Sequence, residues 1–152
     1  MKWTKTDLAQ FLQAQEYVDT ILIPLIPFQF SQEKDMEKEA SQSEWVSLFA
    51  MGIEKELAGR VMLVPSYHYL KSADKQMEIE RLNDWMANIQ AQPFKHIFYL
   101  TMDGAWKKEE GALTGNLLWF PMMYDYKNDS GTGDLLQEQI DQVIEVIRTF
   151  WA

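Results

Sequence analysis

The sequence predicts a three-layer α/β/α domain with about four strands, largely parallel, and helices on both faces of the sheet. Three observations predict this class. Short apolar runs alternate with longer segments of helical periodicity along all 152 residues. Three runs are followed directly by proline, at Pro24, Pro65 and Pro121, and proline removes a donor from a strand ladder. The run 61–64, Val-Met-Leu-Val, is apolar throughout, as in a strand buried on both faces.

The first helix and the first strand are predicted near the start of the chain. Thr4 or Thr6 can cap a helix that ends near Glu16. Residues 18–23 follow as an apolar strand, and we expect Pro24 to end it.

A polar tract, a helix and a second strand come next. The tract 31–43 holds almost no apolar residue, so it is either a frayed helical turn or a mobile loop. Ser41 and Glu44 form a capping box for a helix that ends near residue 58. The strand 61–64 then completes a strand–helix–strand unit, which makes the two strands parallel.

Two further strands are predicted in the second half. Ser72 caps a third helix, and Pro93 prevents that helix from continuing. Residues 96–101 form the third strand and residues 117–120 the fourth. Between them, 105–116 fits a short helical turn or part of a hairpin, because its glycines disfavour a full helix.

The last helix has the clearest pattern. Asp134 and Gln137 form a capping box after the loop 127–133. Apolar residues then recur on one face as far as Trp151, so we expect a docked C-terminus.

Composition excludes several classes of function. The chain has 14 basic and 23 acidic residues, a net charge of −9, and only three arginines. A nucleic-acid binder needs a basic patch, as does a protein held on an anionic membrane, so we expect neither partner. No cysteine is present, which excludes thiolate chemistry and suits a cytoplasmic location. No cofactor fingerprint or metal-ligand spacing appears, so we expect no cofactor and no metal.

The candidate site is at the carboxyl ends of the strands, where open parallel sheets bind ligands. Polar and aromatic residues follow the predicted strands there. Those expected to line a ligand site are Ser66, Tyr67, His68, Asp103 and Tyr124, with Tyr69 and Asp125 beside them. His68, oriented by Asp103 or Asp125, is the candidate base.

Catalytic motifs are absent around these residues. No glycine flanks Ser66 as a nucleophile elbow requires. The stretch 131–134, Gly-Thr-Gly-Asp, lacks the Lys-Ser/Thr of a phosphate-binding loop. His96 is predicted at the amino end of its strand, away from His68, so the two histidines do not predict a shared metal site.

One stretch carries a family resemblance. The opening Met-Lys-Trp and the segment from Gln13 to Pro27 resemble the YpiF-type family of small proteins from Gram-positive, spore-forming bacteria. The resemblance implies a small cytosolic bacterial protein, and it supplies no catalytic residues.

Two classes of function follow. The first is a non-enzymatic binding or regulatory module that meets a protein partner through the carboxyl ends of the strands or a sheet edge. The alternative is a small enzyme or small-molecule-binding protein that uses Tyr67 and His68. The first is favoured, because no nucleophile–base pair is recognisable.

Overall fold

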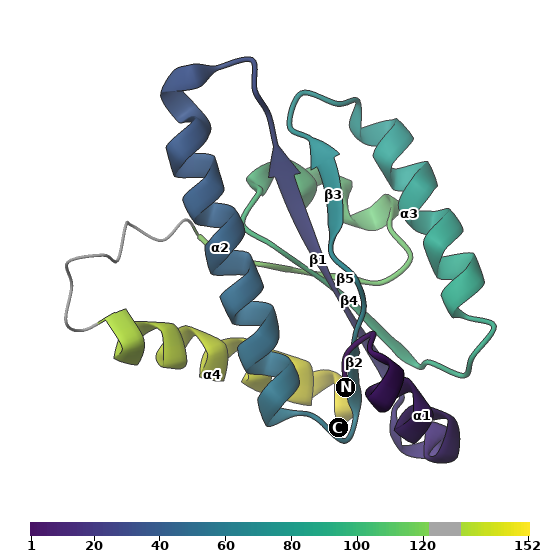
Figure 1. Ribbon diagram of the computed structural model, residues 1–152. Helices are drawn as coiled ribbons and strands as arrows, with labels where there is room; N and C mark the ends of the chain where they lie inside the picture. Colours follow the sequence, from purple (N-terminus) through teal and green to yellow (C-terminus); the bar gives the residue numbers. More distant parts are fainter. Residues whose placement is uncertain (122–131) are drawn as a thin grey trace.

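A computed structural model describes residues 1–121 and 132–152 (Figure 1). The strands are β1 (Thr20–Phe28), β2 (Val61–Leu63), β3 (Tyr67–Leu70), β4 (His96–Thr101) and β5 (Asn116–Trp119). The α-helices are α1 (Lys5–Gln13), α2 (Glu33–Glu56), α3 (Lys75–Ile89) and α4 (Thr132–Trp151), and two 3-10 segments are η1 (Gln15–Tyr17) and η2 (Gly104–Ala112). None of the described helices is both long and apolar enough to span a membrane.

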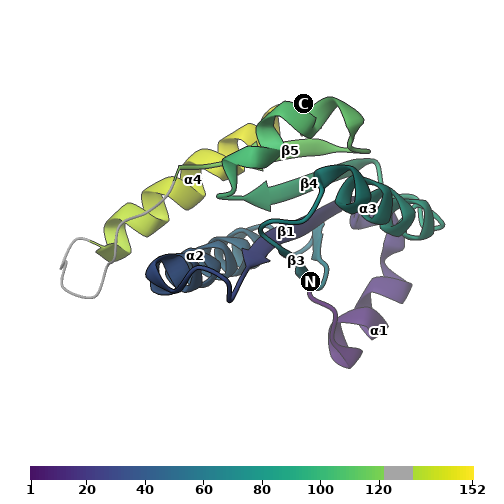
Figure 2. The ribbon, with the colours of Figure 1, turned by 90° about the horizontal axis from the view of Figure 1, so that it is seen from above.

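The sheet confirms the predicted α/β class. Its order is β2–β1–β4–β5, with β3 also paired to β1, and every pairing is parallel. Figure 2 shows helices on both sides of the sheet, with α2 and α4 on one face and α1 and α3 on the other. The connections from β1 and β4 lead in opposite directions, so the topological switch point is between these two strands.

Two apolar clusters hold the layers together, and β1 contributes to both. Leu22 and Ile26 point toward α2 and α4, in a cluster with Phe49, Ile53 and Ile144. The alternate residues of β1 pack on the other face.

Ile21, Ile23 and Leu25 belong to that second cluster, together with Leu82 of α3 and Trp106 of η2. Because β1 is buried on both faces, its sequence is a continuous apolar run rather than an alternating one.

The prediction that the first strand ends at Pro24 is wrong, because β1 continues through this proline to Phe28. The Thr20 N–H donates to the Arg60 C=O, and the Leu22 C=O accepts from the Val64 N–H. The backbone groups of Thr20 and Leu22 therefore face the β2 side of the sheet. By alternation the nitrogen of Pro24 faces the same side and has no proton to donate.

The neighbouring strand is interrupted at that level. Leu22 pairs with Leu63, whereas Leu25 pairs with Tyr67, so three steps along β1 correspond to four along its neighbour. The extra residue forms a bulge around Pro65, which divides the edge strand into β2 and β3.

The predicted start of the second helix is also wrong. α2 begins at Glu33, so most of the tract 31–43 is helical and Ser41 lies inside the helix. The tract lacks apolar residues, but Glu, Lys, Met, Ala and Gln are good helix formers. Glu33 and Asp35 in the first turn also interact favourably with the helix dipole.

Other boundaries needed smaller corrections. Asp74 caps α3, in place of the predicted Ser72, by accepting from the Gln76 N–H at 3.1 Å. The ambiguous segment after β4 forms η2, and a hairpin is excluded because β4 and β5 are parallel. Asp134 lies within the first turn of α4, which begins at Thr132. Most of the predicted loop 127–133 is outside the described residues.

The amino ends of the strands are joined by a polar cluster. Arg60 Nε donates to Asp19 Oδ1 at 2.9 Å, and its guanidinium lies 4.0 Å from the ring centre of Trp151. Trp151 Nε1 donates to Thr20 Oγ1 at 2.9 Å, so the described C-terminus is docked. Burial opposes ionisation of Asp19, but hydrogen bonds from Arg60 and Thr20 outweigh it and lower the pKa of this carboxyl.

Candidate functional site: an open sheet edge beside helix α2

The predicted site residues are placed on different surfaces. Tyr67 is buried against α3, whereas His68 is exposed on the opposite face of the sheet, because successive residues of a strand alternate. Ser66 lies in the bulge, and Asp103 is two residues after the end of β4. Tyr124 and Asp125 fall outside the described residues.

Three predicted residues, Tyr67, Tyr69 and Asp103, take part in hydrogen bonds on the α3 face of the sheet. Tyr69 Oη donates to Asp103 Oδ2 at 2.6 Å and accepts from Trp106 Nε1 at 2.7 Å. Tyr67 Oη donates to Glu78. Burial, reinforced by the neighbouring carboxylates, raises the pKa of Tyr67 to about 12 and that of Tyr69 further. Both phenols are therefore neutral hydrogen-bond donors at physiological pH.

The polar groups at the switch point also bond to one another. Thr101 Oγ1 donates to the Leu25 C=O at 3.1 Å and accepts from the Asp103 N–H at 3.0 Å. Asp103 Oδ1 in turn accepts from the Ala105 N–H at 3.0 Å and caps η2. These contacts fix the chain between β4 and η2.

A different feature emerges at the edge strand. The outer side of β2 is covered by the start of the chain: the Met1 ammonium donates to the Val61 C=O at 2.8 Å, and the Leu63 N–H donates to the Met1 C=O at 2.8 Å. The ammonium also lies 2.9 Å from Glu54 Oε1 of α2. Lys2 then forms a single parallel bridge with Leu63.

The outer side of β3 has no strand partner among the described residues. The Lys71 N–H donates to the Phe28 C=O, so Tyr67, Tyr69 and Lys71 direct their backbone groups toward β1. By alternation, the N–H groups of His68 and Leu70 face outward. Figure 2 shows β3 at the margin of the sheet, on the far side of β1 from β4.

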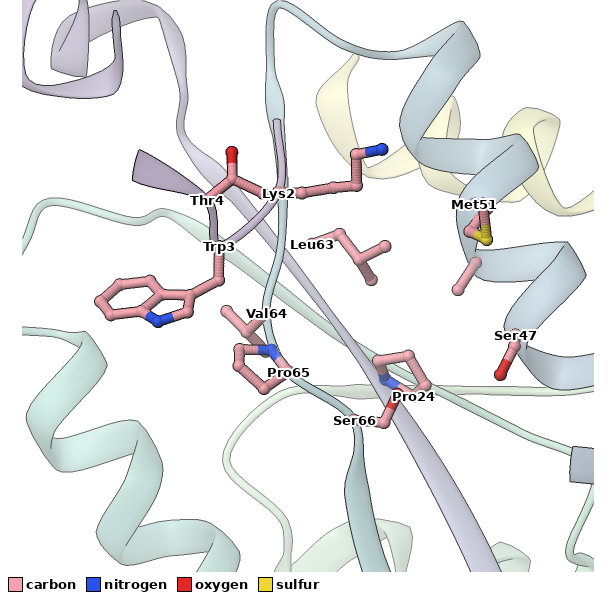
Figure 3. A pocket seen from close by; sticks show the side chains of 11 residues that line it. Lys2, Trp3, Thr4, Pro24, Ser47, Met51, Leu63, Val64, Pro65 and Ser66 are labelled. Atoms are coloured by element: carbon pink, nitrogen blue, oxygen red, sulfur yellow. The ribbon is translucent and has the colours of Figure 1, made fainter. Parts of the chain in front are cut away.

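Two separate hollows lie along this edge between α2 and the β2–β3 strand, and we call the pair the edge groove. Its first hollow, shown in Figure 3, has a volume of about 370 Å³ and lies at the bulge. There Ser47 and Met51 of α2 face Leu63 and Ser66 of the edge strand.

The second hollow of the edge groove has a volume of about 400 Å³ and lies farther toward the carboxyl ends. The two hollows are neighbours along the edge. Ser43, which lines the second hollow, is one turn of α2 before Ser47 of the first, and His68 is two residues after Ser66. Aromatic, aliphatic and acidic side chains line it, among them Phe28, Phe30, Met36, Glu39 and Glu44.

No group of three or more His, Asp or Glu side chains among the described residues could hold a metal ion. His96 is at the first position of β4, at the amino end of the sheet, whereas His68 is near the carboxyl end of β3. The chemistry that the edge groove offers is therefore backbone pairing, apolar contact and negative charge.

His68 and Ser66 were predicted from the sequence, and a sheet edge was predicted without its location, whereas Glu39 was not predicted. The alternation in Tyr67 to Leu70 is a strand signal, and it could have indicated that the edge strand resumes after Pro65. No comparable signal marks Glu39, because its ion-pair partner Lys71 is distant in sequence.

Comparison with known proteins gives the family. The chain is 30% identical over 152 residues to the uncharacterized protein YpiF of Bacillus subtilis (strain 168), an alignment that covers 100% of this chain and 99% of that protein. A family model described as "Protein of unknown function (DUF2487)" matches residues 9–151. No solved structure matches the chain. These matches confirm the resemblance, and the protein belongs to the YpiF-like DUF2487 family of bacterial proteins.

Proposed function

We propose that the protein is a non-enzymatic binding module that pairs the outer edge of β3 with an extended segment of a partner protein. The observation that carries this proposal is the contrast along one edge: the backbone of β2 is paired by Met1, whereas the outward groups of His68 and Leu70 have no strand partner among the described residues. Such edges accept an added strand through main-chain hydrogen bonds.

Exposed apolar side chains beside the edge support this function. Phe28 and Leu70 are cross-strand neighbours and are 44% and 52% exposed, and Phe30 beyond them is 78% exposed. At the other end of the edge groove, Trp3 is 67% exposed. An added strand would cover part of this apolar surface, which is the main source of binding free energy at such sites.

Charge supports a basic partner. The chain carries a net charge of −9, and Glu39 and Glu44 line the second hollow. A positively charged segment is attracted to this surface, whereas nucleic acid and a second copy of the same acidic chain are repelled.

The alternative function, an enzyme or small-molecule site around Tyr67 and His68, has weaker support. It requires the two side chains in one space, but they lie on opposite faces of the sheet. The carboxylate of Asp103 is already occupied by Tyr69 and Ala105. We also propose that the chain is a single domain, supported by the sharing of β1 between both clusters, and that it acts in the cytoplasm.

The test uses a blocked hexapeptide of alternating valine and arginine, titrated into ¹⁵N-labelled protein. We expect saturable shifts of the backbone signals of residues 66–71, with a dissociation constant in the range of about 10 µM to 1 mM. The same peptide with every backbone nitrogen methylated has no N–H to donate along either edge and should not bind.

Two variants at one position separate backbone pairing from side-chain contact. His68→Pro removes an outward N–H without breaking the bonds to β1 and should abolish binding. His68→Ala keeps that N–H and should retain binding. Equal binding by the methylated peptide, or binding that survives His68→Pro, would contradict the proposal. A dimer in sedimentation that dissociates in His68→Pro would show that the edge pairs with a second copy instead.

A further inference from the structure

Glu39 and Glu54 both have largely buried side chains on α2, but Glu54 lies 2.9 Å from the Met1 ammonium whereas Glu39 has a weaker partner. The Glu39 side chain is only 11% exposed, and its Oε2 is buried without a hydrogen-bond partner among the described residues. Its other oxygen, Oε1, lies 3.7 Å from Lys71 Nζ, which is a long ion pair with a lysine that is 43% exposed. The carboxylate is therefore only partly compensated.

A buried carboxylate oxygen without a donor is costly, because it has lost water and gained no hydrogen bond. In folded proteins the missing donor for such a group is supplied by an ordered water, an ion, a ligand or a partner. Glu39 lines the second hollow of the edge groove, together with Phe28, Met36 and His68. A group that enters this hollow therefore contacts the Glu39 side chain, and a small shift of that side chain would expose its buried oxygen to the group.

The walls of the hollow define the group that fits. Phe28, Phe30 and Met36 offer apolar surface for a methylene chain, and aromatic faces attract cations. Glu44 adds a second carboxylate to the lining. An apolar stem that ends in a positive charge matches both features, and a guanidinium can donate two parallel hydrogen bonds to one carboxylate.

The position of the hollow relates this group to the edge. His68 and Leu70 face the α2 side of the sheet, where the hollow is situated. A strand paired along β3 would place alternate side chains on that same side.

We propose that the hollow beside Glu39 receives a basic side chain of the partner segment, arginine in preference to lysine. That the basic side chain comes from a partner segment rests on the proposed function. Binding of a basic side chain to the hollow can be tested without any strand pairing.

The probe is N-acetyl-arginine methylamide, and its comparator is the citrulline analogue, which has nearly the same shape and no charge. Titrated into ¹⁵N-labelled protein, the arginine probe should shift the amide signals of Glu39, Ala40, Ser43 and His68 with a dissociation constant of about 1–10 mM. Binding should weaken as ionic strength rises from about 0.01 M to about 0.15 M. The citrulline analogue should bind at least about tenfold more weakly.

Three variants locate the interaction. Glu39→Gln should weaken arginine binding about tenfold or more. Glu80→Gln, at an exposed position of α3, makes the same charge change away from the hollow and should bind like the parent. Lys71→Met removes the competing cation and should tighten binding, so the proposal is testable even if Glu39→Gln disturbs the fold.

Equal binding of arginine and citrulline, unchanged binding by Glu39→Gln, weaker binding by Lys71→Met, or no shift at about 100 mM probe would each overturn the inference. If the arginine probe binds as described but the strand peptide does not bind, the hollow is correctly assigned and the proposed function fails. If the strand peptide binds and the arginine probe does not, the proposed function stands and this inference fails.

Discussion

The edge strand of this sheet has two halves that share one neighbour and differ on their outer side. β2 and β3 both run parallel to β1, and both have buried residues on their inward faces. Beyond β2, Met1 pairs with the strand and its ammonium lies 2.9 Å from Glu54. The outer side of β3 has no strand partner in the part of the chain that the structure describes.

The comparison shows that a local break in the hydrogen-bond ladder between β1 and the edge strand determines how much of that edge is paired. Pro24 cannot donate toward the edge strand, and the neighbouring chain bulges by one residue around Pro65. The N-terminal pairing extends only to a bridge between Lys2 and Leu63, just before the bulge. The pairing of the N-terminal segment with the edge strand therefore ends where the register between that strand and β1 changes. β3, the half nearest the carboxyl ends of the strands, is left open.

The largest expected effect contrasts the two sides of β3. Tyr69→Ala should lower the free energy of unfolding by about 3–5 kcal/mol, because it removes a buried ring in edge contact with Trp106 and two hydrogen bonds. Leu70→Ala, on the α2 face where this side chain is 52% exposed, should cost no more than about 1 kcal/mol. Urea unfolding of both variants measures this, and equal losses would show that the α2 face of β3 is packed.

The polar cluster at the amino ends tests the closed part of the sheet. Asp19→Asn should lower the free energy of unfolding by about 1–2 kcal/mol at pH 7, because charged hydrogen bonds from the partly exposed Arg60 are lost. The pKa of Asp19 is lower in the folded state, so its stabilisation is present above the unfolded value of about 4 and is lost as pH falls through the folded pKa.

Urea midpoints of the parent and Asp19→Asn at several pH values measure this dependence. The two proteins should differ most near neutrality and converge in acid. A difference that grew as the pH fell would contradict the assigned hydrogen bonds.

A smaller effect is expected where the N-terminus covers β2. Glu54→Gln removes the carboxylate that faces the Met1 ammonium and should lower the free energy of unfolding by about 1 kcal/mol. Amide exchange at Leu63 should accelerate, while exchange at Tyr69 stays unchanged. Glu80→Gln, an exposed charge change on α3, is the control. An unaltered Leu63 amide would mean that the ion pair does not hold the N-terminal segment.

The sequence patterns were sufficient for the class of fold and for several elements. The strand predicted at residues 96–101 matches β4 at both ends, since it is an apolar run bounded by polar residues. The stripe that predicts the last helix continues to Trp151, which ends α4. In these cases, the signal is carried by residues within the element itself.

The sequence patterns failed at positions whose structure depends on contacts with residues that are distant in the sequence. Pro24 resembles a strand end, and only the bulge in the neighbouring strand explains why β1 continues through it. Ser66, Tyr67 and His68 were expected to share a site because they follow the predicted strand 61–64, at the carboxyl ends of the sheet. Their side chains point to different surfaces once the register of β3 is fixed. Glu39 belongs to a tract that looks uniformly solvated, yet its side chain is only 11% exposed and pairs with Lys71.

The central claim is that β3 presents an open backbone edge while β2 does not, and residue-resolved amide hydrogen exchange of the free protein tests it most directly. We expect slow exchange at Leu63, which donates to Met1, and at Tyr69, which faces β1. His68 and Leu70 should exchange fast although they lie in the same strand as Tyr69. Protection of the His68 amide as strong as that of Leu63 would contradict the account.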